Sequence, residues 1–480
     1  YFINVDRKEC EIKMKVRTRF APSPTGYMHI GNLRTALYAY LIAKHHHGDF
    51  LLRIEDTDQQ REVEGATKLI FDILKETGLN YDEGPLKEGQ VGPYIQSQRL
   101  DIYHTYAKEL IKRGGAHYCF CQDEFEHDPC INLTQQQINE KREQGIPYVI
   151  RQTIPQEGIT AFDDEVYGHI EVENKTLNEG ILIKSDGYPT YNFANVIDDH
   201  LMNITHVIRG NEYLSSTPKY NLIYKAFGWK IPTYIHLPTV NKDENHKLSK
   251  RNGDASYIDL KNQGYLKDAI INYIALLGWA PENEQEIFTL DELIENFSIQ
   301  RISKSPSIFD IDKLKWMNGI YLRNMTLQDF HQLVTPYYKN IQLNIDFFEL
   351  SSVLQQRIEK LSDIEDMTDF INQPLSFDIT LYTHKKMKTN PNLAYHVLST
   401  VYNQLIHFND FHSDDKLSQL FINLAKENNM KNGQIMWPIR VALTNKAFTP
   451  GGAVEIAHIL GKEETLKRIQ QALKDLEACL

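Results

Sequence analysis

The first third of the chain alternates between short strand-like runs and a longer segment with apolar residues at helical spacing. Residues 15–20 are predicted as a strand, and a turn-rich loop follows them. The helical spacing then continues until Gly48, after which residues 50–54 are predicted as a second strand. A strand, a glycine-bearing loop, a helix and a second strand are typical of a parallel sheet that binds ligands at its strand ends.

The pattern changes between residues 119 and 190, where short β-like runs are divided by polar turns. We interpret this segment as an inserted α+β module. The earlier pattern resumes after it, with helices predicted at 193–201 and 216–227 and strands at 205–208 and 234–237. One parallel sheet split by an insertion explains this order better than two unrelated domains.

The last part of the chain, beyond Thr335, is predicted to be helical. Apolar residues recur at spacings of three and four between Leu350 and Phe370, and again between Leu393 and Leu405. Each stretch predicts an amphipathic helix in a bundle. The expected fold is therefore α/β, with a split Rossmann-type parallel sheet, an inserted α+β connective domain and an all-helical C-terminal region.

Composition excludes some classes of protein. The chain has 480 residues, 41% of them hydrophobic and 24% charged, which is enough apolar material for several cores and excludes a disordered protein. No run approaches the roughly 18 apolar residues of a membrane span, so we expect no membrane partner. Five cysteines favour free thiols and a cytoplasmic location. The net charge of -12 disfavours a protein held on nucleic acid by bulk charge alone.

The first segment with candidate chemistry follows the first predicted strand. A proline-stiffened loop, residues 22–26, leads to His29 and Gly31 at the start of a helix. Gly31 would let a ligand approach the backbone closely, and the helix N-terminus favours an anion. His29 can donate hydrogen bonds to phosphate oxygens. Taken alone, an ordinary βα turn also explains this segment.

A second segment, residues 247–253, carries three cations within five residues. Its Lys247, Lys250 and Arg251 suit a pyrophosphate leaving group, on which negative charge accumulates in the transition state. Taken alone, a solvated basic loop also explains it.

Together the two segments resemble the HIGH and KMSKS motifs of class I aminoacyl-tRNA synthetases. The resemblance is closest to glutamyl-tRNA synthetases of bacterial type, and it extends from about Lys15 to Ile469. Its separate blocks are residues 17–26, 52–58, 185–191, 195–200 and 309–319. It implies an enzyme, a glutamate–tRNA ligase, which attaches L-glutamate to tRNA-Glu through a glutamyl-adenylate and requires bound tRNA to activate glutamate. Two alternatives remain: a synthetase that is non-discriminating or specific for tRNA-Gln, and, more remotely, a non-catalytic RNA-binding paralogue.

The resemblance also implies roles for individual residues. Arg19 and Arg209 would bind the side-chain carboxylate of glutamate, for which a guanidinium fork is well suited. Glu55 would hold the substrate ammonium, although the acids at 55, 56 and 58 could instead cap the next helix. The remaining expected residues are Ala21, Ser23, Tyr191 and Asn195 for glutamate, Gly31 and Ser249 with His29, Lys247 and Lys250 for ATP, and His29, Lys250 and Lys247 for catalysis.

Other expectations concern cofactors and partners. Mg²⁺ is expected with ATP. The expected partners are ATP, L-glutamate and tRNA-Glu, or tRNA-Gln in the alternative. We expect a monomer. Cys119, Cys121 and Cys130 resemble part of a zinc site found in some glutamyl enzymes. Asn132 replaces the usual last ligand, His117 and His127 are substitutes at non-matching positions, and a metal-free hairpin is the alternative.

The expected domains follow from the same reading. Residues 1–14 are an upstream extension, 15–105 and 192–240 are the two halves of the catalytic domain, and 106–191 is the connective, acceptor-binding domain. Residues 241–335 carry the KMSKS loop and a stem-contact region, and 336–480 form the anticodon-binding region. Trp316, Tyr321 and Trp437 are candidates for stacking on anticodon bases, with buried packing as the alternative.

Overall fold

The computed structural model describes residues 15–26, 28–58, 61–121, 128–244, 246, 248 and 256–480. The chain forms two compact units. Unit 1 contains the chain up to Leu260 together with Lys267–Ile311, and unit 2 contains Lys261–Leu266 and Asp312–Leu480. The domain boundaries expected from the sequence stay a prediction.

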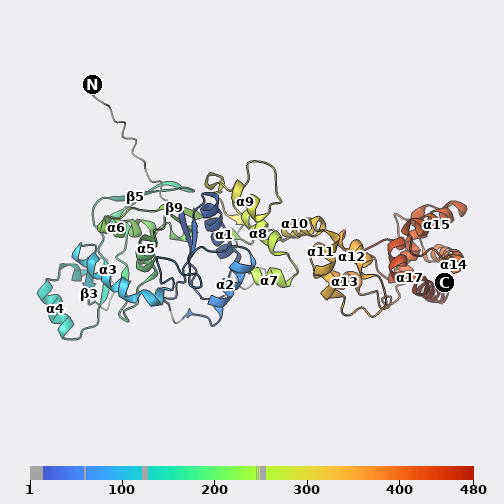
Figure 1. The fold of residues 1–480 in the computed structure, drawn as a ribbon, viewed down its shortest axis with the longest axis horizontal. Helices are drawn as coiled ribbons and strands as arrows, with labels where there is room; N and C mark the ends of the chain where they lie inside the picture. Colours follow the sequence, from blue (N-terminus) through green and yellow to red (C-terminus); the bar gives the residue numbers. More distant parts are fainter. Residues whose placement is uncertain are drawn as a thin grey trace, which may run out of the picture. The chain divides into compact units, whose positions relative to one another are not determined.

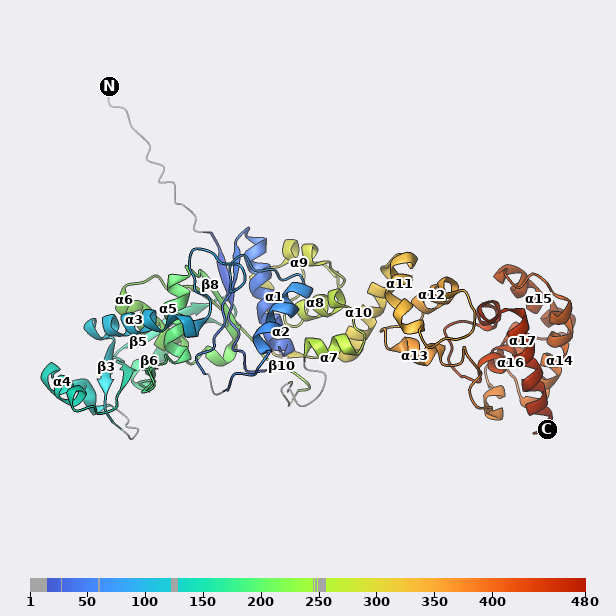
Figure 2. The same ribbon diagram turned by 60° about the horizontal axis from the view of Figure 1, so that its bottom comes forward.

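Unit 1 is built around parallel strands. Strand β1 (Arg17–Phe20) pairs in parallel with β2 (Asp49–Leu52), and helix α1 (Ile30–His45) connects them. Strand β8 (His206–Gly210) pairs in parallel with β9 (Thr233–Leu237), and α6 (Thr217–Phe227) connects these two. The Thr205 amide donates to the Arg17 carbonyl over 2.9 Å, so β8 lies beside β1. In Figures 1 and 2 the blue strands from the start of the chain lie beside the green strands. The prediction of a parallel sheet split by an insertion is confirmed.

The insertion lies between α3 (Leu100–Lys112) and α5 (Tyr191–Leu201), and its α+β character is confirmed. Three strands form an antiparallel sheet in the order β3 (Ala116–Cys119), β4 (Val149–Gln152) and β7 (Ile181–Ile183), with α4 (Gln135–Glu143) between β3 and β4. Strands β5 (Ile159–Asp164) and β6 (Gly168–Glu173) form an antiparallel hairpin that does not join this sheet. Its Asp164 pairs in parallel with Tyr234 of β9, so the hairpin extends the parallel sheet.

The turn after α1 explains two sequence features. His47 adopts a left-handed conformation with φ of 51°, and a Cβ on Gly48 would lie 2.1 Å from the Val16 carbonyl oxygen. Only glycine fits there. The strand predicted at 50–54 ends earlier, at Leu52. Ile54, predicted in the same strand, does not continue the pairing with β1, because its amide donates to the Tyr94 carbonyl over 2.9 Å.

Unit 1 contains further helices and short strands. They are α2 (Ala66–Glu76), β10 (Val240–Asn241), α8 (Lys267–Ala275), α9 (Leu290–Asn296) and β11 (Ser307–Ile308), while α7 (Tyr257–Asn262) crosses the boundary between the units. Leu33, Leu37 and Leu41 on the predicted helical face of α1 are fully buried.

Unit 2 is helical, as predicted. Its helices are α10 (Ile311–Asn324), α11 (Leu327–Val334), α12 (Phe347–Gln355), α13 (Asp363–Thr368), α14 (Pro391–His407), α15 (Asp414–Glu427), α16 (Asn432–Thr444) and α17 (Ala453–Glu477). Helices α14 to α17 pack together around one apolar core (Figure 2). The helix predicted from Leu393 is confirmed by α14.

The single helix predicted between Leu350 and Phe370 is wrong, because α12 and α13 are separated by residues 356–362. Asp363 accepts hydrogen bonds from the amides of Glu359 and Lys360, over 3.1 and 3.0 Å, and these bonds form a turn. Ile358 in this turn is fully buried, so the apolar spacing continues through a segment that is not helical. Among the helices of the described residues, none combines the length and the apolar character needed to span a bilayer.

Candidate functional site

A polar cavity of about 360 Å³ lies at the carboxyl ends of the parallel strands of unit 1. We call it the main cavity. Ala21 follows β1, Glu55 follows β2, Gly210 ends β8 and Pro238 follows β9, and all four line it. Ligands of open parallel sheets bind at this edge. Eight of the residues singled out in the sequence line the main cavity: Arg19, Ala21, Ser23, His29, Gly31, Glu55, Tyr191 and Arg209.

An adjoining cavity of about 730 Å³ shares Ser23, Glu55 and Tyr191 with the main cavity. Its further lining carries charges of both signs, from Asp58, Arg61, Lys184 and Asp186. A ligand larger than a nucleotide or an amino acid therefore has room to continue beyond the main cavity.

His29 and Gly31 form the start of α1. His29 is the N-cap residue, and its Nδ1 accepts a hydrogen bond from the Gly31 amide over 3.1 Å. A neutral imidazole with Nδ1 as acceptor carries its proton on Nε2, which is a donor. A Cβ on Gly31 would meet one described atom within 4 Å, the His29 Nδ1 at 3.5 Å. The missing side chain of Gly31 is therefore not explained by packing within the protein.

The basic loop expected to bind pyrophosphate cannot be compared in detail, because Lys247, Ser249 and Lys250 lie outside the described residues. Two described residues, one within this segment and one just after it, reach the site. Leu248 lines the main cavity, and Ser256 forms an antiparallel bridge with His29. The two segments that resemble HIGH and KMSKS therefore share one cavity.

Arg19 is one of three arginines that line the main cavity, with Arg34 and Arg209, and it is 3% exposed. Its Nε donates to Asp199 Oδ1 over 3.0 Å and its Nη1 donates to the Ile208 carbonyl over 3.2 Å. Asp199 also accepts from Arg53 Nη1 over 2.7 Å. Burial alone would raise the pKa of Asp199, but Arg19 and Arg53 outweigh it and hold that pKa below its usual range.

Glu55 joins the same network. Its Oε1 accepts from Arg53 Nη2 over 2.9 Å, and the side chain reaches both cavities. Burial raises the pKa of Glu55, and the neighbouring Arg53 and Arg19 offset only part of that effect. A cationic ligand group beside Glu55 would favour its ionised form.

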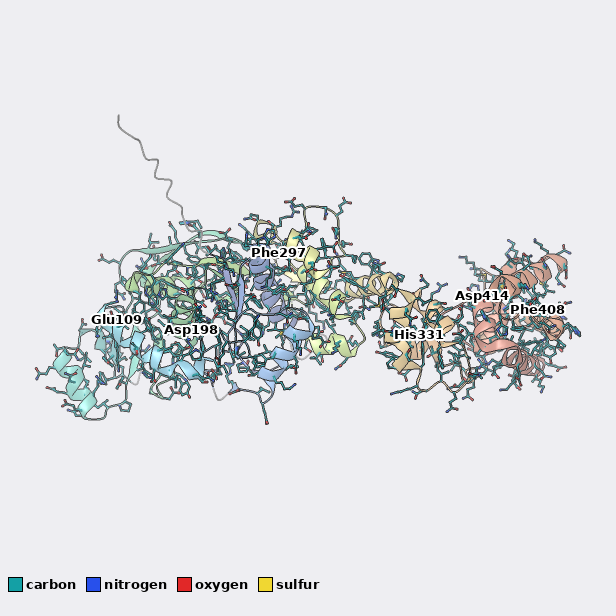
Figure 3. The ribbon with its side chains drawn as sticks, in the orientation of Figure 1. Glu109, Asp198, Phe297, His331, Phe408 and Asp414 are labelled. Atoms are coloured by element: carbon teal, nitrogen blue, oxygen red, sulfur yellow. The ribbon has the colours of Figure 1, made fainter. Side chains whose placement is uncertain are left out.

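Asp198 anchors the other end of the network from a fully buried position on α5 (Figure 3). Its Oδ1 accepts from Arg99 Nε over 2.7 Å, and its Oδ2 accepts from Gln96 and Tyr103, each over 2.8 Å. Arg53 Nε lies 3.6 Å away. Three arginines thus face three carboxylates in the interior, where a charge without a partner is very costly.

Arg209, which also lines the main cavity, is held differently from Arg19. Its Nε donates to His236 Nε2 over 3.1 Å and its Nη2 donates to Thr217 Oγ1 over 2.8 Å. Its guanidinium carbon lies 4.7 Å from the centre of the Tyr220 ring. Among the described residues, no carboxylate forms an ion pair with it. Arg209 therefore presents a positive charge that no carboxylate in the described part of the chain neutralises directly.

Some predicted site residues do not reach the cavity. Asn195 donates to the Tyr191 carbonyl over 2.6 Å, and within the described chain it lines neither the main nor the adjoining cavity. The alternative that the acids at 55–58 cap the next helix is wrong, because Gly65 is the N-cap of α2. Asp56 instead accepts from the Ser97 amide over 2.8 Å.

The cysteine cluster contains a fourth donor that the sequence did not indicate. Cys119, Cys121, Asp128 and Cys130 each offer a ligand atom, and these atoms all lie within 4.8 Å of one another. The sulfurs of Cys121 and Cys130 are 3.4 Å apart. His127 lies outside the described residues, and His117 Nε2 is 3.2 Å from Asp128 Oδ2, so it contacts the cluster through the carboxylate. Three sulfurs and one oxygen fit a closed four-coordinate zinc site.

The proposed stacking residues of unit 2 differ in their surroundings. Trp316 is 42% exposed. The Nε1 of Trp437 donates to the Leu381 carbonyl over 2.8 Å, and the guanidinium carbon of Arg440 lies 4.4 Å from the centre of its ring.

Sequence reasoning missed the residues that support Arg19 and Arg209. Arg53, Asp198 and Asp199 lie in the segments that carried the family resemblance, and their charge in predicted strand and helix interiors was the available signal. His236 and Asp164 gave no signal, because their meeting depends on the hairpin that joins the parallel sheet.

Comparison with known proteins agrees with this geometry. Residues 15–316 match the family model described as "tRNA synthetases class I (E and Q), catalytic domain", and residues 329–473 match "Anticodon binding domain". Curated relatives named glutamate–tRNA ligase include one from Clostridium kluyveri, 55% identical over 96% of this chain and 98% of its own length. Another, from Clostridium novyi, is 53% identical over 97% and 99%.

Solved structures agree as well. The glutamate tRNA ligase of Elizabethkingia meningosepticum, crystallised with its amino acid, superposes with a TM-score of 0.88 at 34% identity, covering 96% of this chain and all of that one. The glutamate–tRNA synthetase of Elizabethkingia anophelis superposes with a TM-score of 0.87 at 33% identity. With family models matching most of its length and relatives above 50% identity, this chain belongs to the class I tRNA synthetases of the E and Q family.

Proposed function

We propose that the protein attaches L-glutamate to tRNA-Glu at the expense of ATP, through a glutamyl-adenylate. The observation that carries the proposal is the position of Arg19 and Arg209 in the same cavity as His29 and Gly31. A guanidinium binds a carboxylate through two parallel N–H donors and offers only donors to the NH₂ group of a carboxamide. The anticodon-binding family match over residues 329–473 supports tRNA as the second substrate.

Each cavity residue has a role in this proposal. Arg209, with Arg19 beside it, holds the side-chain carboxylate of glutamate, while Glu55 accepts the substrate ammonium. His29 and the amides at the start of α1 bind the ATP phosphates. Ala21, Ser23 and Tyr191 form the walls of the same cavity. Asn195 supports Tyr191 indirectly, because its side-chain amide donates to the Tyr191 carbonyl in the first turn of α5.

The reaction needs positioning and charge neutralisation rather than a covalent enzyme intermediate. The glutamate α-carboxylate attacks the α-phosphorus of ATP, forming a C–O–P bond as the bond to pyrophosphate breaks. Mg²⁺ enters as part of the ATP substrate. Lys250 and Lys247 neutralise the pyrophosphate, and Ser249 belongs to the same loop. A ribose hydroxyl of the terminal tRNA adenosine then attacks the carbonyl carbon of the adenylate, forming the glutamyl ester as the bond to the phosphate oxygen breaks, and AMP leaves.

Charging of two purified transcripts tests this function. With ATP and labelled glutamate, the protein is expected to charge tRNA-Glu and to leave tRNA-Gln uncharged, with omission of ATP as the control. Equal charging of both transcripts would identify a non-discriminating synthetase. Charging of neither would leave a non-catalytic RNA-binding protein.

Gly31→Ala is expected to raise the KM for ATP by about 10-fold, while the KM for glutamate stays within about twofold. The added methyl group is accommodated by the protein, since its nearest described neighbour would be 3.5 Å away, but it enters the space of the nucleotide. Alanine favours a helix over glycine, so the melting temperature should not fall. Gly180→Ala is the matched control, with Lys219 Nζ at 4.0 Å as its nearest neighbour. An unchanged KM for ATP would mean that Gly31 does not approach the nucleotide.

We further propose that Cys119, Cys121, Cys130 and Asp128 hold a structural zinc ion, which would fix the end of β3 against residues 128–130. Purified protein is expected to contain about one zinc ion per chain. Cys119→Ser and Asp128→Ala should each lose zinc and lower the melting temperature. Cys479→Ser, which alters an exposed free thiol, should retain it. Full zinc content in Asp128→Ala would remove the carboxylate from the ligand set.

The compartment follows from the same chemistry. The four cysteines in the described part of the chain are free thiols, which supports the cytoplasm as the site of action. A monomer remains our prediction for the oligomeric state.

A further inference from the structure

Three buried side chains, Asp164, His236 and Arg209, form a continuous hydrogen-bonded chain that ends at the main cavity. Asp164 Oδ2 and His236 Nδ1 are 2.6 Å apart, and His236 Nε2 accepts from Arg209 Nε over 3.1 Å. The side chains of Asp164 and His236 have no exposed surface. Arg209 and His236 are directly paired across β8 and β9, whereas Asp164 ends strand β5 of the inserted hairpin.

The direction of each hydrogen bond follows from the donors around Asp164. Its Oδ1 accepts from the amides of Val166 and Tyr167, over 3.0 and 2.9 Å, and its Oδ2 accepts from the His236 amide over 3.1 Å. A carboxylate surrounded by these donors is the acceptor for His236 as well, so Nδ1 carries the imidazole proton. The remaining nitrogen, Nε2, then has a lone pair directed at the Arg209 Nε–H. Burial lowers the pKa of His236, which agrees with a neutral ring.

This arrangement uses one edge of the Arg209 guanidinium and leaves the other available. Nε and Nη2 form the side edge, which donates to His236 and Thr217. Nη1 has no hydrogen-bond partner among the described residues, and together with the second hydrogen of Nη2 it forms the end edge. Arg209 lines the main cavity, so this end edge is the two-donor fork that a ligand carboxylate can meet.

The surroundings of Arg209 give little other directional control. The rings of Tyr213, Tyr220 and Tyr234 have their centres 4.7 to 5.3 Å from its guanidinium carbon. Ring faces attract the cation but do not fix its rotation in the way that a hydrogen bond does. Thr217 holds one nitrogen, and its hydroxyl donates onward to the Tyr213 carbonyl over 2.9 Å. His236 is the acceptor that fixes Nε.

We propose that Asp164 and His236 are positioning residues that aim Arg209 at the side-chain carboxylate of the amino-acid substrate, and that they thereby set the preference for a carboxylate over a carboxamide. This proposal rests on the proposed function, in which Arg209 binds that carboxylate. Asp164 holds the tautomer of His236, and His236 holds the guanidinium. The hairpin of the insertion therefore contributes to amino-acid selection without lining the main cavity.

Two amide substitutions of His236 separate positioning from simple packing. His236→Asn places an amide nitrogen near the position of Nδ1, which keeps the bond to Asp164 and loses the acceptor for Arg209. His236→Gln places an amide oxygen near the position of Nε2, which keeps the acceptor and loses the donor to Asp164. Because asparagine is shorter than glutamine by one methylene group, His236→Leu is the control for packing: it fills most of the buried volume but offers no acceptor to Arg209. A packing role would make His236→Leu resemble His236→Gln, whereas a positioning role would make it resemble His236→Asn.

The experiment measures amino-acid activation with ATP and bound tRNA-Glu, first in the unaltered protein and then in the variants. His236→Asn is expected to raise the KM for glutamate by roughly 10- to 100-fold, the range for losing a hydrogen bond to a charged group. The KM for ATP should stay within about twofold, and glutamine should become a relatively better competitor. His236→Gln should restore the KM for glutamate to within about fivefold.

Asp164→Asn provides a second test if a His236 variant does not fold. Its NH₂ group can donate to Nδ1, which would move the ring proton to Nε2 and set it against the Arg209 Nε–H. We expect a KM increase for glutamate like that of His236→Asn. Equal effects of His236→Asn and His236→Gln, or a parallel rise in the KM for ATP, would overturn the proposal. Failure of the unaltered protein to activate glutamate would instead overturn the proposed function.

Discussion

Arg209→Ala is expected to lower kcat/KM for glutamate activation by about 100-fold or more, while the KM for ATP stays within about twofold. A charge-assisted contact that is lost in a desolvated site costs about 3 kcal/mol, and 1.4 kcal/mol corresponds to a factor of ten. Since Arg209 makes no ion pair with a described residue, its removal leaves no buried carboxylate without a partner. Pyrophosphate exchange in the presence of tRNA measures the effect.

Arg209→Lys is the matched control, because it keeps the charge and loses the two-donor fork. It should recover only part of the activity, and its melting temperature should equal that of the unaltered protein to within a few degrees. Arg19→Lys is a less selective variant, since Arg19 also pairs with Asp199. Unchanged exchange in Arg209→Ala would show that the side-chain carboxylate binds elsewhere.

The largest effect on stability is expected for Asp198→Ala, which should lower the free energy of unfolding of unit 1 by about 3–5 kcal/mol. The substitution leaves the buried Arg99 Nε and the Tyr103 hydroxyl without their acceptor, at distances of 2.7 and 2.8 Å in the intact network, and it leaves the Arg99 charge without its carboxylate. Urea unfolding followed by tyrosine and tryptophan fluorescence measures the loss.

Asp72→Ala serves as the control for that experiment. Asp72 pairs with Lys68 on α2 over 2.6 Å, and both side chains are more than half exposed. Such a pair contributes less than about 0.5 kcal/mol. A loss of similar size in both variants would mean that the Asp198 network does not hold the interior of unit 1 together.

The sequence predicted the strands of the sheet and the helices that connect them, because their apolar residues recur at regular spacing. The alternation of apolar residues predicted β1, α1, β8, α6 and β9 with small errors at their ends. It failed at residues 356–362, since a buried turn can continue the apolar spacing of the helices beside it. The spacing of apolar residues indicates which side chains are buried. It does not distinguish a helix from a turn whose side chains are buried equally well.

The main cavity was predictable to the extent that its residues lie in recognisable motifs. Arg19 lies in the first strand, His29 and Gly31 follow that strand, Glu55 follows the second, and each reaches the cavity. The groups that hold them were not predictable in the same way. Asp199 supports Arg19 from 180 residues away, and Asp164 meets His236 from 72 residues away. Such pairs depend on three-dimensional packing that no local pattern encodes.

The β5–β6 hairpin matters for the design of chimaeric enzymes in which the inserted domain is exchanged. A chimaera that exchanges the whole insertion for that of another synthetase would also exchange the residue at position 164, and with it the partner of His236. A graft that replaces the hairpin together with the rest of the insertion therefore needs a carboxylate side chain at position 164. Grafts that keep residues 159–173 from the recipient should preserve the selectivity of the host enzyme.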